Sequence, residues 1–151
     1  MRVPALVRLV RPALAPTAAA DVLAGAAFLG GASTGSLAMA VGGSVCIYLG
    51  GMAQNDLCDR ERDVELHPDR PLVAQPGLVK PVYLIVLLLY VTGVAISGAL
   101  WAALAAALLA NAYNLGLKKR FPFDALTLGG ARAANLCIGF TIAAGPMSGV
   151  A

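Results

Sequence analysis

The chain has 151 residues, of which 59% are hydrophobic and 13% are charged. An average soluble domain carries about 25% charged residues, so this composition argues against a soluble protein and favours a membrane protein. The formal net charge is +3, but no basic stripe with interleaved aromatic residues accompanies it, which excludes nucleic acid as the favoured partner. The length allows one domain, residues 1–151, with roughly five spans of about 20 residues each.

The first apolar segment, residues 12–32, follows a short basic stretch. Basic residues before an Ala-rich run are also typical of a signal peptide. Pro16 and Thr17 interrupt that run, and apolar character resumes after Asp21. We therefore expect an uncleaved first span.

Four more apolar segments follow, at residues 36–54, 81–97, 99–117 and 124–145. The first, second and fifth segments of the chain are rich in Gly and Ala, which allows transmembrane helices to approach closely. The third segment is more hydrophobic than the others and is predicted to face lipid. Because the third and fourth segments are nearly continuous, we expect a tight turn at Ser97-Gly98 between two antiparallel helices.

The distribution of basic residues predicts the topology, because cytoplasmic loops carry an excess of Lys and Arg. With the amino terminus inside, the connections 54–80 and 117–123 are also cytoplasmic, and the turns 33–36 and 97–99 face outward. Ten of the eleven basic residues then lie inside and the outward turns carry none. The exception, Arg132, lies in the fifth segment, where an ionisable side chain should face the bundle or a wet cavity.

Residues 55–72 form a dense charged patch between these apolar segments. Six of the chain's eight acidic residues lie in it, namely Asp56, Asp59, Glu61, Asp63, Glu65 and Asp69. The patch belongs to the one long polar connection of the sequence, and long connections tend to carry function. A solvated loop whose arginines balance the acids is the alternative interpretation, but the spacing of one, four and eight residues after Asn55 favours a site.

Three of these acids share a helical face if the second span continues past Gln54. At about 100° per residue, Asp56, Asp59 and Asp63 lie at about 0°, 300° and 340°, on a stripe roughly 10 Å long. Clustered carboxylates resist ionising unless a cation is present. Their oxygen ligands suit Mg²⁺, which takes its remaining ligands from water and substrate phosphates. The predicted ligand is a magnesium-bound phosphate ester or diphosphate.

Basic side chains on the same predicted side of the membrane complete this hypothesis. Arg70 and the cluster 118–120 are placed to contact the remaining phosphate oxygens. A polyphosphate headgroup at the cytoplasmic surface, with an apolar tail among the helices, satisfies both the charged and the apolar parts of the chain.

These motifs resemble those of a known family. Asn-Asp-x-x-Asp-x-x-x-Asp at 55–63, with Arg-Pro-Leu at 70–72, is similar to the first aspartate-rich motif of the UbiA-type intramembrane prenyltransferases. Arg11-Pro12 and the stretch 113–120 also follow the order usual in that family. The resemblance extends over essentially the whole chain.

The resemblance implies a helical membrane protein in which an isoprenoid chain passes from a prenyl diphosphate to an acceptor that the sequence does not identify. It assigns Mg²⁺ binding and the catalytic role to Asp56, Asp59 and Asp63. It also assigns substrate binding to five residues, namely Asn55, Arg70, Tyr113, Lys118 and Lys119. The two lysines are not separable by sequence, because the spacing from the tyrosine varies in the family.

The chain departs from the family in size. Members have about nine helices and a second aspartate-rich motif, so this sequence resembles the amino-terminal half. The apolar ending at residues 141–151 predicts an interrupted protein. The alternatives are a second polypeptide that supplies the missing half, or an inactive short form.

Two other kinds of function remain open at this point. One is a non-catalytic membrane subunit or scaffold on the same half-fold, and the other is a divalent-cation transporter that uses the acidic face as an entry site. A transporter predicts carboxylates along a path across the bundle, whereas an enzyme predicts them at its cytoplasmic mouth.

Polar residues inside the apolar segments add secondary expectations. Asn111, Asn114 and Asn135 are predicted to form hydrogen bonds between helices. Asp21 lies within the first span, where charge is costly and suggests function. It either shapes the acceptor site, pairs with Arg132, or is neutral and hydrogen-bonded close to the interface.

Overall fold

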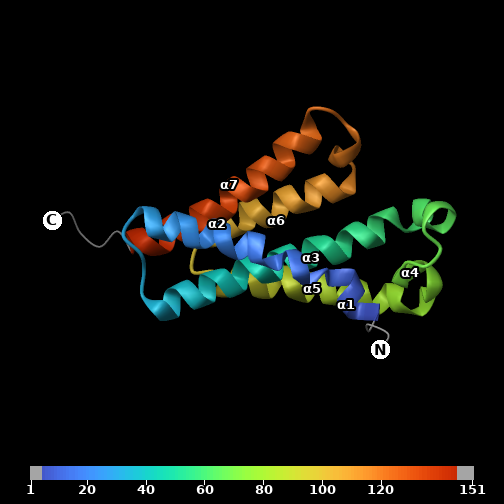
Figure 1. The fold of residues 1–151 in the computed structure, drawn as a ribbon, viewed down its shortest axis with the longest axis horizontal. Helices are drawn as coiled ribbons and strands as arrows, with labels where there is room; N and C mark the ends of the chain where they lie inside the picture. Colours follow the sequence, from blue (N-terminus) through green and yellow to red (C-terminus); the bar gives the residue numbers. More distant parts are fainter. Residues whose placement is uncertain (1–4, 146–151) are drawn as a thin grey trace.

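Apolar helices occur at all five predicted positions (Figure 1). The structure is a computed structural model that describes residues 5–145. The five helices are α2 (Ala15–Phe28), α3 (Thr34–Leu66), α5 (Val79–Ile96), α6 (Leu100–Leu115) and α7 (Phe123–Ala144). Residues 5–145 contain no strand. The all-helical bundle predicted from the sequence is therefore confirmed.

Short helical elements join these five helices. They are α1 (Ala5–Val10) and η1 (Pro12–Leu14) before α2, α4 (Pro71–Ala74) and η2 (Pro76–Leu78) before α5, and η3 (Leu117–Lys119) before α7. Figure 1 shows α1, α4 and the α6–α7 connection toward one end of the bundle, and the α2–α3 and α5–α6 connections toward the other. The segments rich in Lys and Arg thus share one end, as the topology requires. Arg2 and residues 146–151 of the predicted interrupted ending lie outside the described residues.

The five helices differ in their capacity to cross a membrane. Among the described residues, α3, the segment Pro76–Ile96 and α7 are long and apolar enough to span. By contrast, α2 has 14 residues and α6 has 16, below the roughly 20 that a bilayer requires. The five helices lie at the predicted positions, but only three of those described are long enough for a full span.

The α5–α6 turn lies where the sequence predicts it. Helix α5 ends at Ile96, and the Ser97 hydroxyl accepts a hydrogen bond from the Ala99 backbone N–H at 3.2 Å. Gly98 has φ 69°, a left-handed conformation that glycine adopts without steric cost. A β-branched residue could therefore not replace Gly98 in this turn without strain.

Glycines allow two pairs of helices to approach at backbone distance. A Cβ at Gly139 of α7 would collide with the backbone carbonyl of Val22 in α2, and one at Gly25 would collide with that of Leu136. Gly43 of α3 and Gly93 of α5 form a similar mutual contact. The small residues of the first, second and fifth segments thus act as predicted, through close packing rather than flexibility.

Helix α5 presents its largest apolar side chains outward. Leu84, Leu87 and Val91 are exposed, while Val82 and Val86 are buried against α3. An exposed apolar face this broad is typical of a surface that contacts lipid. The lipid-facing character predicted for the third segment therefore applies to one face of the helix.

We expect Gly139→Ala to destabilise the α2–α7 pair, because the added methyl group meets backbone atoms that cannot rotate away. Overpacking of this kind costs about 1–3 kcal/mol. Gly129→Ala, on the same helix with no atom within 4 Å of its Cβ, is the matched control and should be neutral or stabilising. Unfolding in mixed micelles, followed by helical circular dichroism, measures both. Equal effects in the two variants would contradict the close-packing interpretation.

Candidate diphosphate site

Helix α3 positions the predicted motif. It begins after Ser33, whose hydroxyl accepts a hydrogen bond from the Ser36 backbone N–H at 3.2 Å, an N-cap interaction. It continues without a break through the motif to Leu66. The predicted extension beyond Gln54 is confirmed, so the helical spacing of the three aspartates holds.

Arg70 joins two of the aspartates. Its Nη1 donates to Asp63 Oδ2 at 2.6 Å and lies 3.5 Å from Asp56 Oδ1. Both aspartates are buried, each 4% exposed as a whole residue, and a buried carboxylate requires a partner of opposite charge. Arg70 therefore fixes the motif, and it does so from the loop that leads into α4.

Arg11 is a partner that sequence reasoning did not place in the site. Its Nη2 donates to Asp56 Oδ1 at 3.0 Å. Arg11 has φ 46°, a conformation uncommon for residues other than glycine and one that is often associated with functional sites. The sequence connects the Arg11-Pro12 pair with the family, but it does not indicate which carboxylate Arg11 contacts.

Lys118 binds the remaining aspartate from the η3 connection. Its Nζ lies 2.7 Å from Asp59 Oδ1 and donates to Asn55 Oδ1 at 2.9 Å. Asp59 Oδ1 is buried and lacks hydrogen-bond geometry with any group in the described chain, so its contact with Lys118 is an ion pair alone. Lys119 is exposed. The structure thus separates the two lysines that the sequence could not.

These seven residues form what we call the aspartate cluster, namely Arg11, Asn55, Asp56, Asp59, Asp63, Arg70 and Lys118. Its three carboxylates are balanced by three cations. Asp56 and Asp63 share Arg70, whereas Asp59 lies about 40–60° around the helix toward Lys118. The stripe predicted for the aspartates is thereby divided between two sets of cations.

An apolar cluster holds the cations in place. Leu9 of α1 and Leu72 of α4 pack with Ala53 and Leu57 of α3, and both leucines are almost fully buried. Helices as short as α1 and α4 are not stable alone. Their burial against α3 therefore positions Arg11 and Arg70 beside the carboxylates.

The fit of the cluster to Mg²⁺ depends on its donor atoms. Within residues 5–145, no group of three or more His, Cys, Asp and Glu side chains is arranged as an all-protein metal cage. Mg²⁺ commonly binds through one or two carboxylates together with substrate phosphates. The Asp59 side chain is 16% exposed and pairs with Lys118 through Oδ1, so its second oxygen offers such a ligand. The residues fit a magnesium ion shared with a phosphate-bearing substrate, and their role as ligands stays a prediction.

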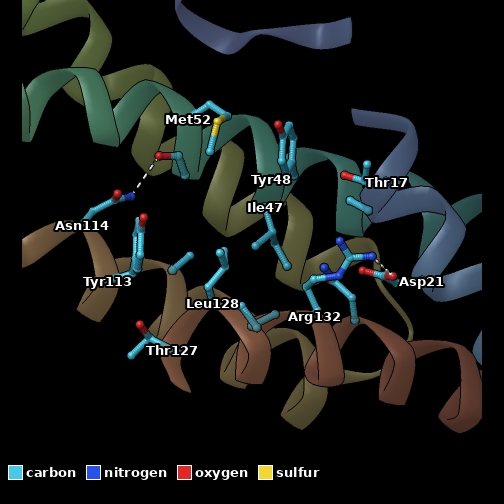
Figure 2. Close-up of a pocket in the computed structure, with 16 residues that line it drawn as sticks. Thr17, Asp21, Ile47, Tyr48, Met52, Tyr113, Asn114, Thr127, Leu128 and Arg132 are labelled. Carbon is cyan, nitrogen blue, oxygen red and sulfur yellow. Dashed lines mark hydrogen bonds and ion pairs between the residues drawn. The ribbon is translucent and has the colours of Figure 1, made fainter. Parts of the chain in front are cut away.

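A cavity lies between α2, α3, α6 and α7 (Figure 2). It encloses about 220 Å³. Tyr48, Gly51 and Met52 of α3 line it from one side, and Tyr113 and Leu128 line it from another. Tyr113, predicted to bind substrate with the lysines, therefore belongs to this cavity and not to the aspartate cluster.

A polar network joins the cavity to the bundle core. Gln54 Nε2 donates to Asn111 Oδ1 at 2.6 Å, and its Oε1 accepts from Tyr90 at 2.7 Å. Asn114 Nδ2 donates to the Gly51 carbonyl at 2.9 Å. Asn135 similarly accepts from Ser44 at 2.9 Å. The interhelical hydrogen bonds predicted for the three asparagines are confirmed.

Comparison with known proteins identifies the group to which this arrangement belongs. The chain matches the UbiA prenyltransferase family over residues 13–151. It is a member of that family. The comparisons with curated proteins and with solved structures found no match. Membership in the UbiA family agrees with the resemblance inferred from the aspartate motif, and it makes the chain a prenyltransferase-type membrane protein.

We expect the two lysines of the η3 connection to respond differently to substitution. Lys118→Met leaves Asp59 and Asn55 without their cation, and breaking such a largely buried pair costs about 3 kcal/mol. Lys119→Met removes an exposed charge and should change stability by less than about 0.5 kcal/mol. Chemical unfolding of both variants in the same micelles provides the measurement. A similar loss of stability in both variants would show that the contacts of Lys118 do not account for the loss.

Proposed function

We propose that this UbiA-family chain holds the prenyl diphosphate of a magnesium-dependent membrane prenyltransferase, which transfers the isoprenoid chain to an acceptor. The supporting observation is the aspartate cluster, in which each motif aspartate has a cation from outside its own helix. Such a site offers carboxylates to a metal and N–H donors to phosphate oxygens.

The residues have separable roles in this proposal. Asp56, Asp59 and Asp63 would hold Mg²⁺, which acts as a Lewis acid toward the departing diphosphate. Arg70 orients two of these carboxylates before substrate arrives, since it already contacts both. Because all three aspartates are ion-paired, the geometry required for binding is largely preorganised, and preorganised charge lowers the barrier to reaction.

The cations would contact the diphosphate directly. Arg11 and Arg70 present guanidinium groups, which match the paired oxygens of a phosphate better than an ammonium does. Lys118 supplies a point charge from the opposite side of the cluster, and Asn55 fixes its ammonium group. Lys119, exposed at the same connection, would add long-range attraction for the anionic headgroup.

The cavity would hold apolar parts of the reactants away from water. Its walls are mostly apolar, and Tyr113 faces it. Exclusion of water protects a reactive carbocation-like chain from hydrolysis. We place the aspartate cluster and the amino terminus at the cytoplasmic face, because the basic connections share that end of the bundle.

The location of the carboxylates favours an enzyme over a cation transporter. The three motif aspartates lie in the last three turns of α3, toward one end of the bundle (Figure 1). A transport path needs ligands along the bundle axis. Deeper in the bundle, Asp21 is paired with Arg132 at 2.8 Å, which does not suit a cation site.

We expect Asp59→Asn to abolish most Mg²⁺-dependent binding of a prenyl diphosphate, with a loss of at least about tenfold in affinity. Purified protein in nanodiscs, radiolabelled geranylgeranyl diphosphate and a magnesium titration provide the measurement. Glu61→Gln removes the same charge from an exposed position of the same helix and serves as the matched control.

Two results would refute the metal assignment. One is unchanged, magnesium-dependent retention of the diphosphate in Asp59→Asn and Asp56→Asn. The other is an equal loss in Glu61→Gln, which would indicate a general effect of surface charge. Circular dichroism of each variant verifies that the helices remain folded.

A further inference from the structure

The connection between α6 and α7 exposes two cations beside two aromatic rings. Lys119 and Arg120 are exposed, and Phe121 and Phe123 are 88% and 49% exposed. We call these four residues the connection patch. Within the part of the chain that the structure describes, neither cation forms an ion pair, in contrast to Lys118 of the aspartate cluster. The aspartate cluster thus accounts for one of three consecutive basic residues and not for the other two.

Backbone hydrogen bonds hold the connection patch in one turn. The Arg120 N–H donates to the Leu117 carbonyl at 3.0 Å, and the Arg120 carbonyl accepts from the Phe123 N–H at 2.8 Å. Asp124, in the first turn of α7, is the nearest acid along the chain, and its Oδ1 is buried. Figure 1 shows the connection at the tip of the α6–α7 pair, apart from α1 and α4. The cations and the rings therefore share a defined and basic surface.

The length of α6 sets the depth of the connection patch in the bilayer. Helix α6 has 16 residues, which at about 1.5 Å per residue gives about 24 Å, whereas the hydrocarbon core is roughly 30 Å thick. Leu115, the last residue of α6, is 74% exposed, so the apolar surface of the helix continues to its end. A short span is accommodated by flanking side chains that extend to the interface. The connection patch therefore lies at the boundary between acyl chains and headgroups.

Each half of the connection patch suits one layer of that boundary. Exposed phenyl rings lose contact with water when they enter the acyl region, which is favourable. The long apolar stems of Lys119 and Arg120 allow their charged groups to reach outward to the headgroups. Phosphate oxygens accept hydrogen bonds from both side chains, and a guanidinium can bind two such oxygens together. The connection patch thus matches a lipid that has an apolar tail and an anionic head.

Charge and depth distinguish this lipid from other partners. A zwitterionic headgroup carries a cation beside its phosphate, and this cation repels Lys119 and Arg120, whereas an anionic headgroup attracts them. An acidic soluble protein would also attract the cations. It would not reach rings that lie at the level of the acyl chains, so an anionic lipid is favoured over a protein partner.

We propose that the connection patch binds anionic phospholipid, with Lys119 and Arg120 on headgroup phosphate and Phe121 among the acyl chains. The inference goes beyond the proposed function, because the connection patch supplies no member of the aspartate cluster. It has a consequence for that cluster, since Lys118 belongs to the same connection. A lipid bound here also restrains the backbone from which Lys118 reaches Asp59.

A single-tryptophan reporter tests the lipid preference. Trp101 is the one tryptophan of the chain, so Trp101→Phe combined with Phe121→Trp moves the indole into the connection patch. The full chain is reconstituted in phosphatidylcholine vesicles with equal small fractions of a brominated lipid, either phosphatidylglycerol or phosphatidylcholine. Bromine quenches an indole that it contacts, so fluorescence reports the local lipid. We expect apparent association of phosphatidylglycerol to be at least about threefold stronger than that of phosphatidylcholine.

Removal of the two cations should abolish this preference. In the reporter protein, Lys119→Gln with Arg120→Gln should make quenching by the two lipids equal. The matched control is Arg62→Gln with Lys80→Gln, which removes the same charge from exposed positions of α3 and α5. It should retain the preference, because direct contact rather than net charge defines the site.

Several results would overturn the lipid assignment. Equal quenching in the reporter protein does so, as does a preference that persists without Lys119 and Arg120 or that is lost in the matched control. Absence of quenching by either lipid places residue 121 outside the bilayer and also overturns it. Circular dichroism verifies that each variant is folded. If the reporter does not fold, native mass spectrometry of wild-type protein from equimolar lipid micelles decides the question, and equal retention of the two lipids contradicts the proposal.

Discussion

The ion pairs of two buried carboxylates organise this end of the molecule. Asp56 and Asp63 are each 4% exposed, and an isolated buried charge would cost several kcal/mol. Arg11 and Arg70 meet this requirement, and each comes from a segment adjoining a short helix beside α3. These ion pairs therefore fix the backbone that leads into α2 and the loop that follows α3. The proposed diphosphate site and the local folding therefore depend on the same contacts.

Much of this arrangement follows from periodicity and spacing. The five helical positions, the Ser97-Gly98 turn and the continuation of α3 were predictable, because each depends on local sequence. Which cation pairs with which aspartate was not, since Arg11 and Lys118 are 45 and 59 residues from their partners. Lys118 and Lys119 are chemically identical, and only their directions in the η3 connection distinguish them.

The short length of α2 was not predictable from hydropathy, because backbone constraints set the ends of this helix. Hydropathy extends from residue 12 to residue 32, but Pro12 and Pro16 fall in η1 and the first turn of α2. Proline is compatible with a helix start and incompatible with its interior. Gly30 and Gly31 adopt positive φ at the other end. Apolar composition thus describes what can enter a membrane, while these backbone constraints decide where the helix begins and ends.

Helix α3 also explains how a charged site and an apolar cavity can serve one substrate. Tyr48, Met52, Asn55 and Asp59 are spaced four, three and four residues apart, so they lie on one stripe of the helix. The first two line the cavity and the last two contact Lys118. Asp56 and Asp63 lie on the neighbouring stripe toward Arg11 and Arg70. A ligand whose charged head contacts both stripes can therefore extend its apolar part along the first stripe, which leads to the cavity.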